Sequence, residues 1–124
     1  MKPLVYVKSL AVLLALGAFP AFGQDLSGDW KVTGDIGGYA LHAVCTLKQD
    51  TDHKLTGTCK DDKSSAPLTG EIVGRDVTWR YDLDNDGTVY PLVFSGTMVS
   101  DLAIKGGVEA GVVANGPFTA RKQQ

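Results

Sequence analysis

One stretch of the chain has the residue types and spacing of a cation site. Asp82, Asp84 and Asp86 alternate and Gly87 follows, as in the first half of a calcium-binding loop. The last position of such a loop carries a bidentate glutamate, and here that position is Val93. The segment also lies between two predicted strands, where Asp-Gly favours a tight turn. We therefore expect a hairpin tip with no dedicated metal site, and weak calcium binding stays an open alternative.

The sequence shows no arrangement of residues that is typical of catalysis. The two histidines, His42 and His53, fall on the polar face of a predicted strand and in a turn. No nucleophile and base share a motif, and no pair of carboxylates is spaced for acid–base work. The glycine-rich segment 106–111 lacks the Lys-Ser/Thr of a phosphate loop. We expect neither enzymatic activity nor a cofactor.

The two cysteines predict a disulfide. Cys45 and Cys59 flank a hairpin whose turn lies near Asp52. This register places Cys45 opposite Cys59 and Leu47 opposite Gly57, with facing Cα atoms about 4.5–5.5 Å apart, within reach of a disulfide. The spacing is not Cys-x-x-Cys, and no further ligand lies nearby, which argues against a redox or metal pair.

The first residues have the pattern of a secretory signal peptide, which we place at 1–23. Lys2 and Lys8 precede a short apolar run over 10–19, and Pro20 and small residues follow, so that cleavage is expected before Gln24. Residues 24–124 then form a single domain, secreted or periplasmic, with no membrane span after cleavage. The formal net charge of −2 and the lack of a basic stripe argue against nucleic acid as a partner.

Alternating apolar and polar residues predict strands throughout the rest of the chain. Val77, Trp79, Tyr81 and Leu83 alternate with polar neighbours, as in a sheet with one buried face. Pro91 requires a bulge or an outward position for its missing N–H. The pattern predicts an eight-stranded antiparallel up-and-down β-barrel, with a β-sandwich as the alternative. The predicted strands are 27–34, 39–49, 54–61, 67–73, 76–83, 88–97, 101–109 and 116–122.

Four of these strands contain an apolar residue followed two positions later by glycine, so that both face inward. The glycines leave room either for neighbouring rings or for a small ligand, because eight strands enclose little space. For a ligand, the candidate contacts are Tyr39, Trp79, Tyr81, Tyr90 and Phe94. The full set of large inward side chains is predicted to be Trp30, Tyr39, Leu41, Leu47, Leu55, Leu68, Ile72, Val77, Trp79, Tyr81, Tyr90, Leu92, Phe94, Leu102, Ile104 and Phe118.

The segment Leu26-Ser27-Gly28-Asp29-Trp30 resembles the Gly-x-Trp start of the calycin barrels, which include lipocalins, avidins and bacterial metalloprotease inhibitors. The resemblance implies that Trp30 packs across one end of the barrel. It also implies that a basic residue of the last strand, Arg121 or else Lys122, covers the indole. A guanidinium or ammonium over an indole face is an attractive contact.

Three functions are compatible with these features. The first is an exported barrel that binds a small, largely apolar ligand. The second is a protein-binding module, such as an inhibitor of a secreted hydrolase, that uses the loops at one end. The third is an envelope protein without a small-molecule ligand.

Overall fold

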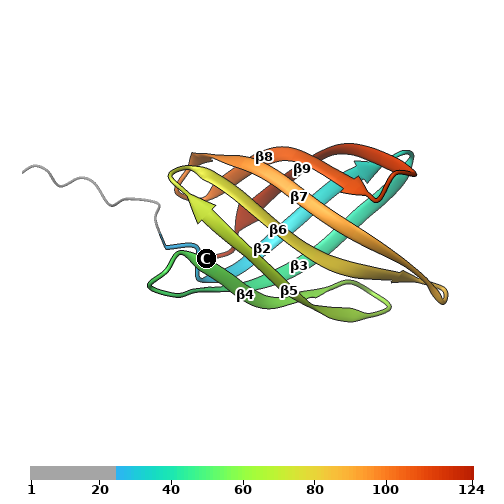
Figure 1. Ribbon diagram of the computed structural model, residues 1–124, viewed down its shortest axis with the longest axis horizontal. Coiled ribbons are helices and arrows are strands. Elements are labelled where there is room, and N and C mark those ends of the chain that lie inside the picture. Colours follow the sequence, from blue (N-terminus) through green and yellow to red (C-terminus); the bar gives the residue numbers. More distant parts are fainter. Residues whose placement is uncertain (1–24) are drawn as a thin grey trace, which may run out of the picture.

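Eight strands follow one another along the chain and form one closed barrel (Figure 1). The computed structural model describes residues 25–124, and the predicted signal peptide with its cleavage site lies outside them. The strands are β2 (Gly28–Ile36), β3 (Tyr39–Gln49), β4 (Lys54–Lys60), β5 (Ser65–Val73), β6 (Asp76–Asn85), β7 (Thr88–Ser100), β8 (Ala103–Ala110) and β9 (Ala114–Lys122).

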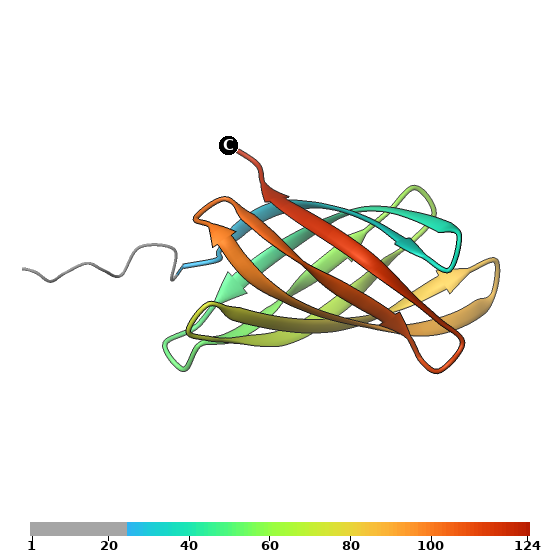
Figure 2. The ribbon, with the colours of Figure 1, turned by 90° about the horizontal axis from the view of Figure 1, so that it is seen from above.

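The topology is up-and-down, with every strand antiparallel to the next. The last strand closes the barrel on the first, with Val32 opposite Ala120 and Gly34 opposite Phe118. In Figure 2 the C-terminal end of β9 meets β2, and the pairing covers Trp30 to Gly34 on β2. The barrel predicted from the alternation is confirmed, and the sandwich alternative is wrong. No helix long and apolar enough to cross a membrane occurs in the part of the chain that the structure describes.

The turns divide between two ends of the barrel. Those after β2, β4, β6 and β8 lie together at one end, which we call the mouth, on the right of Figure 1. Those after β3, β5 and β7 lie at the opposite, closed end, near the first described residues and the C-terminus. This separation follows from the meander, because successive turns alternate between the two edges of an antiparallel sheet.

The disulfide is present as predicted. Cys45 lies opposite Cys59 and Leu47 lies opposite Gly57. The Cys45–Cys59 disulfide links β3 to β4, and the Cα atoms of the two cysteines are 4.0 Å apart. Such a bond is compatible with an oxidising compartment.

An aromatic cluster fills the middle of the barrel. Phe94 stacks on Trp79 at 5.2 Å and on Tyr81 at 5.7 Å between ring centroids. Phe118 meets Phe94 edge-to-face at 5.1 Å. All four rings are buried. Such offset and edge-to-face pairs add to the stabilisation from burial alone.

The space beside the inward glycines is occupied by neighbouring residues. A methyl group on Gly96 would lie 2.8 Å from Ile104 Cγ2 and 3.0 Å from Phe118 Cζ. One on Gly70 would run into the Thr78 carbonyl oxygen, and one on Gly106 into that of Ser95. The glycines therefore let backbones and rings approach closely, and they do not open a cavity in the middle of the barrel.

Two residues predicted to face inward are exposed, Tyr39 at the mouth end of β3 and Leu102. Leu102 is 41% exposed and lies in the turn before β8, which begins only at Ala103. The pairing of β7 with β8 shifts between Met98 and Ser100. β7 extends to Ser100, beyond its predicted end, and Met98 and Ala103 are buried beside this irregularity.

Candidate functional site

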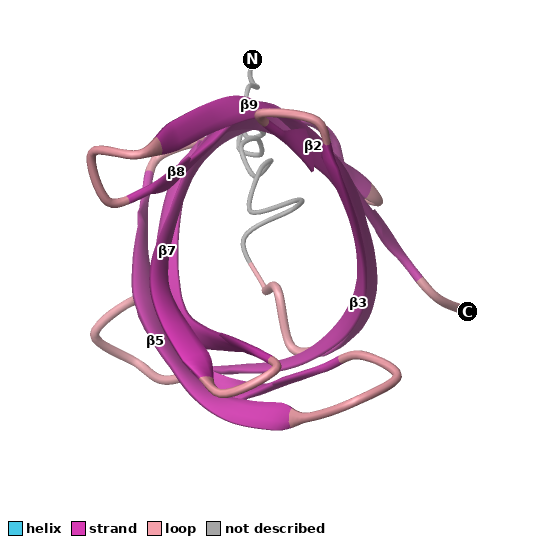
Figure 3. Ribbon diagram, turned by 90° about the vertical axis from the view of Figure 1, so that its right-hand side faces the viewer, coloured by secondary structure: helices cyan, strands magenta, loops and turns pink. Residues whose placement is uncertain are grey.

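The mouth of the barrel contains a pocket of about 220 Å³. Figure 3 looks along the barrel from this end. We call this cavity the mouth pocket. It is lined by Ile36, Tyr39, Leu83, Asn85, Tyr90, Leu92, Ala110, Val113 and Ala114.

Three hairpins bring these residues together. Ile36 faces Tyr39 across the β2–β3 turn, and Leu83 faces Tyr90 across β6 and β7. Ala110 faces Ala114 across the β8–β9 turn. Because both of these residues are alanines, their side chains leave space that larger side chains would fill, and this space is part of the pocket.

The lining is apolar apart from three polar groups at its rim. Aliphatic side chains make up most of the wall, and Tyr39, Tyr90 and Asn85 contribute two hydroxyls and an amide. Tyr39 is 41% exposed, so its ring stands at the border between pocket and solvent. An apolar cavity with a few polar groups is the usual composition of a small-molecule site.

Below the pocket lies a buried hydroxyl with no hydrogen-bond partner within residues 25–124. This hydroxyl belongs to Tyr81, which is 7% exposed and stands opposite the pocket residue Leu92. Burial raises the pKa of Tyr81 well above its ordinary value, and the charges of Asp61 and Tyr39 raise it further. The indole N–H of Trp79 is likewise buried without a partner among the described residues.

The five predicted ligand contacts separate into two groups. Tyr39 and Tyr90 line the mouth pocket. Trp79 and Tyr81 each stack on Phe94 in the aromatic cluster, and none of these three residues lines the pocket.

The sequence analysis missed most of the aliphatic wall, including Ile36, Ala110, Val113 and Ala114. The sequence signal that could have indicated this wall is the pair of small residues, Ala110 and Ala114, on either side of a turn that contains two valines.

Trp30 is buried at the closed end. Its indole Nε1 donates a hydrogen bond to the carbonyl oxygen of Leu26 at 2.9 Å, and both residues are fully buried. Of the two cations that the resemblance offers, Lys122 stands directly opposite Trp30, and its Nζ donates to Asp25 O at 3.4 Å. Arg121 stands opposite Lys31 and is exposed.

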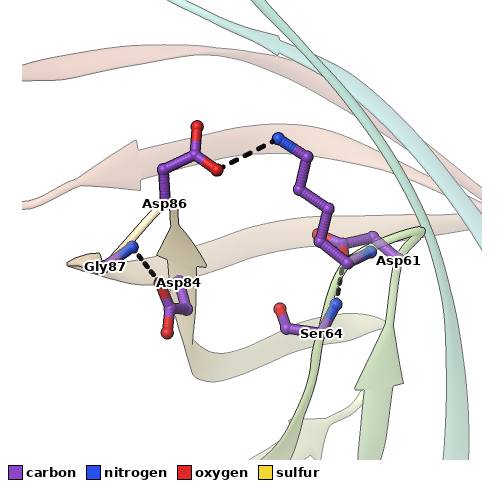
Figure 4. A network of polar contacts seen from close by, with 6 residues as sticks. Asp61, Ser64, Asp84, Asp86 and Gly87 are labelled. Atoms are coloured by element: carbon purple, nitrogen blue, oxygen red, sulfur yellow. Dashed lines mark hydrogen bonds and ion pairs between the residues drawn. The ribbon is translucent and has the colours of Figure 1, made fainter.

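Aspartates hold the turns of the mouth (Figure 4). Asp84 Oδ1 accepts a hydrogen bond from the Gly87 amide at 2.8 Å. Asp61 Oδ1 accepts from the Ser64 amide at 2.9 Å. Asp86 forms an ion pair with Lys63 at 3.4 Å, in which both side chains are mostly exposed. The two contacts between a carboxylate and a backbone amide are typical of Asx turns, in which the carboxylate replaces a backbone acceptor.

The candidate calcium segment is a hairpin tip. Asp82 and Asp84 lie on the outer face of β6, and Asp86 lies in the turn with a φ of 54°. Over residues 25–124, no three acidic, histidine or cysteine side chains are grouped so that they could hold a metal ion. His42 is exposed on β3, and His53 lies in the β3–β4 turn with a φ of 64°.

The chain matches no family model, and no curated protein matches its sequence. The closed, antiparallel, eight-stranded barrel is consistent with a calycin-like architecture.

Proposed function

We propose that the protein is an exported, calycin-like barrel that binds a small, largely apolar molecule in the mouth pocket. The observation that carries this proposal is the apolar, solvent-accessible cavity of about 220 Å³ at one end of a barrel whose middle is filled. The predicted signal peptide and the disulfide support a secreted or periplasmic location. The Gly-x-Trp resemblance agrees with a barrel of this type.

The size of the pocket limits the ligand. Sites for drug-sized molecules measure about 300–1,000 Å³. A cavity of about 220 Å³ takes a compact molecule, or one end of a longer one. The aromatic cluster below prevents deeper insertion, since Trp79 and Phe94 are nearly or fully buried against each other. We infer that the ligand sits at the mouth, with its apolar part against Leu83 and Leu92.

The test uses phenylbutanol, a neutral amphiphile with one ring and one hydroxyl. Nuclear magnetic resonance titration of isotope-labelled protein should shift the amides of Ile36, Leu83, Ala110 and Ala114 together. Ala114→Leu fills the pocket and should abolish these shifts. Ala40→Leu adds the same atoms on the exposed face of β3 and should leave them unchanged. Shifts that are absent, or that cluster away from the mouth, would overturn the proposal.

A second function, binding of a protein partner, is favoured by the β8–β9 turn. Val112 is fully exposed and Val113 is 69% exposed at its tip. Neighbouring exposed apolar side chains in a loop are typical of a contact surface. If the protein inhibits a secreted hydrolase, Val112→Asp should weaken inhibition across a panel of such enzymes. Val44→Asp on the barrel wall, where Val44 is 42% exposed, is the matched control.

A further inference from the structure

The tip of the β6–β7 hairpin lies outside the ladders of both neighbouring strands. The pairing of β5 with β6 ends at Thr69 and Arg80, and the pairing of β7 with β8 begins at Leu92 and Ala110. Between these limits, within the described chain, β6 and β7 pair only with each other. Residues 81–91, which we call the mouth ribbon, therefore continue beyond their neighbours as a two-stranded ribbon. Its turn projects beyond the other turns of the mouth in Figure 1 and in Figure 2.

Pro67 ends the ladder on the β5 side of the mouth ribbon. The Ile72 amide donates to the carbonyl oxygen of His53, on the β4 side, and the pairing of β4 with β5 shows no shift of register. Backbone groups alternate between the two neighbours along a strand, so the odd-numbered residues of β5 face β6. Pro67 is one of them. In the continued register it stands opposite Asp82, to which it has no N–H to offer.

Pro91 occupies the corresponding position on the β8 side. The Met98 amide donates to the Arg75 carbonyl oxygen at 2.9 Å, in register with the β6–β7 ladder. The even-numbered residues of β7 therefore face β6, and Pro91 faces the point where β8 has ended. A proline thus stands at each border of the mouth ribbon, where it prevents the neighbouring ladder from extending.

The mouth ribbon is weakly fastened, although it forms part of the site. At its tip, the ion pair between Lys63 and Asp86 connects it to the β4–β5 turn (Figure 4). Both side chains are mostly exposed, and a pair of this kind contributes little. On its inner side, the ribbon contributes Leu83, Asn85 and Tyr90 to the lining of the mouth pocket. One wall of the pocket therefore belongs to a segment that the flanking strands do not hold.

We propose that the mouth ribbon is a hinged flap, which swings away from β5 to admit a ligand to the mouth pocket and returns to cover it. This inference rests on the proposed function and adds how the site opens. The hinge lies at Arg80 and Leu92, where the flanking ladders stop. The hairpin keeps its own hydrogen bonds as it moves, so opening breaks only the exposed ion pair and part of the apolar packing at the pocket. Closures of this kind take microseconds to milliseconds.

Relaxation-dispersion nuclear magnetic resonance of the ligand-free protein measures motion on this timescale. The amides of the mouth ribbon should show exchange broadening, and those of the closed end should not. Pro67→Val supplies the missing donor opposite Asp82, extends the ladder and should abolish the broadening. A ribbon without dispersion in wild type, or one whose dispersion persists in Pro67→Val, overturns the proposal.

Pro117→Val is the matched control. Pro117 also stands where a ladder stops, because the pairing of β9 with β2 ends at the adjacent Phe118. Beyond this proline, the Gly37 amide donates to the Asn115 carbonyl oxygen at 3.1 Å, so β9 and β2 remain joined there. Pro117→Val should leave the dispersion of the ribbon as in wild type. An equal loss of dispersion in this variant contradicts the role of Pro67.

A second pair of variants tests the tip of the ribbon without changing a proline. Lys63→Gln removes the ion pair with Asp86 and should raise the open population about twofold. Lys60→Gln, at the exposed end of β4, removes the same charge outside that pair and should leave the population unchanged. An open population that is equal in the two variants contradicts the flap.

Phenylbutanol separates this inference from the proposed function. At saturation it should suppress the dispersion, because the bound molecule holds the ribbon closed. Binding at the mouth pocket that leaves the dispersion unchanged, or that occurs with a ribbon showing none, overturns the flap and leaves the pocket proposal standing. Dispersion that Pro67→Val abolishes, in a protein that does not bind phenylbutanol, overturns the proposed function and leaves the hinge motion standing.

Discussion

Gly106 of β8 lies directly opposite Gly96 of β7, and the ring of Phe118 comes within 3.0 Å of the position that a methyl group on Gly96 would take. Gly106 is also the register partner of Phe118 on β9. Two adjacent strands thus come together without side chains between them, and an aromatic ring takes the space. This relationship explains why glycine recurs on the inner face of a barrel whose middle is filled.

Alanine substitutions at two neighbouring residues test this explanation. A methyl group on Gly106 meets the Ser95 carbonyl oxygen and the Cα atom of Gly96, so Gly106→Ala should destabilise the fold by about 3 kcal/mol. At Gly107 the nearest atom is the Gly116 carbonyl oxygen at 3.6 Å, an ordinary contact. Gly107→Ala should leave the free energy of unfolding within about 1 kcal/mol of wild type. Urea unfolding of both proteins gives the comparison, and equal losses would contradict it.

The fold was predictable because alternation and turn residues agree along the chain. All eight strands and the register of Cys45 and Cys59 follow from local patterns. The prediction that Leu102 faces inward was wrong because the irregular pairing between Met98 and Ser100 has no sequence signature as clear as an Asp-Gly turn. Leu102 therefore falls in the turn and not in the strand, while Ile104 faces inward as predicted.

The site was only partly predictable. Tyr39 and Tyr90 were expected at a ligand site and do line the mouth pocket. The depth at which each ring lies depends on how far along its strand it sits from the mouth, and alternation alone does not report that distance. Alternate turns of a meander lie at the same end of the barrel. The position of Asp35, Asp61 and Asp84 at one end could therefore have been derived from the predicted topology.

Loss of the disulfide should weaken the barrel without changing its fold. The bond closes a loop with a sequence separation of 14, for which chain entropy predicts about 3 kcal/mol. A variant with both Cys45→Ala and Cys59→Ala should therefore unfold at lower urea concentration. Wild type treated with reductant is the control and should approach the variant. A midpoint that does not move in either sample would contradict the expected role of the bond.

The two tryptophans should differ in their contribution to stability. Replacing either buried indole by alanine should destabilise by about 3–5 kcal/mol. Trp30→Ala should lose about 1 kcal/mol more than Trp79→Ala, because it also leaves the buried Leu26 carbonyl without its donor. The Trp79 indole N–H has no partner among residues 25–124, so no such bond is lost there. Phenylalanine variants keep a ring at each position and should preserve the order in urea melts.

Tyr81→Phe should stabilise the protein. The substitution removes a buried hydroxyl that has no hydrogen-bond partner in the described chain and keeps the ring stacked on Phe94. An unsatisfied buried group costs about 1–3 kcal/mol, so the free energy of unfolding at neutral pH should rise by about 1 kcal/mol. Tyr39→Phe, on an exposed ring, is the control and should change stability little. A marked loss of stability in Tyr81→Phe would show that the hydroxyl has a structural role.

The same variant should also resist alkali better than wild type. Burial raises the pKa of Tyr81 above the value of about 10 for a tyrosine in an unfolded chain. Below pH ~10 the hydroxyl is protonated in both states, and its effect on stability is constant. Above pH ~10 the unfolded chain releases a proton that the folded chain retains, and stability falls by up to about 1.4 kcal/mol per pH unit until the folded pKa is reached. The difference between wild type and Tyr81→Phe in urea midpoints should therefore widen between pH 9 and 11, and a difference that stays constant would mean that solvent reaches the hydroxyl.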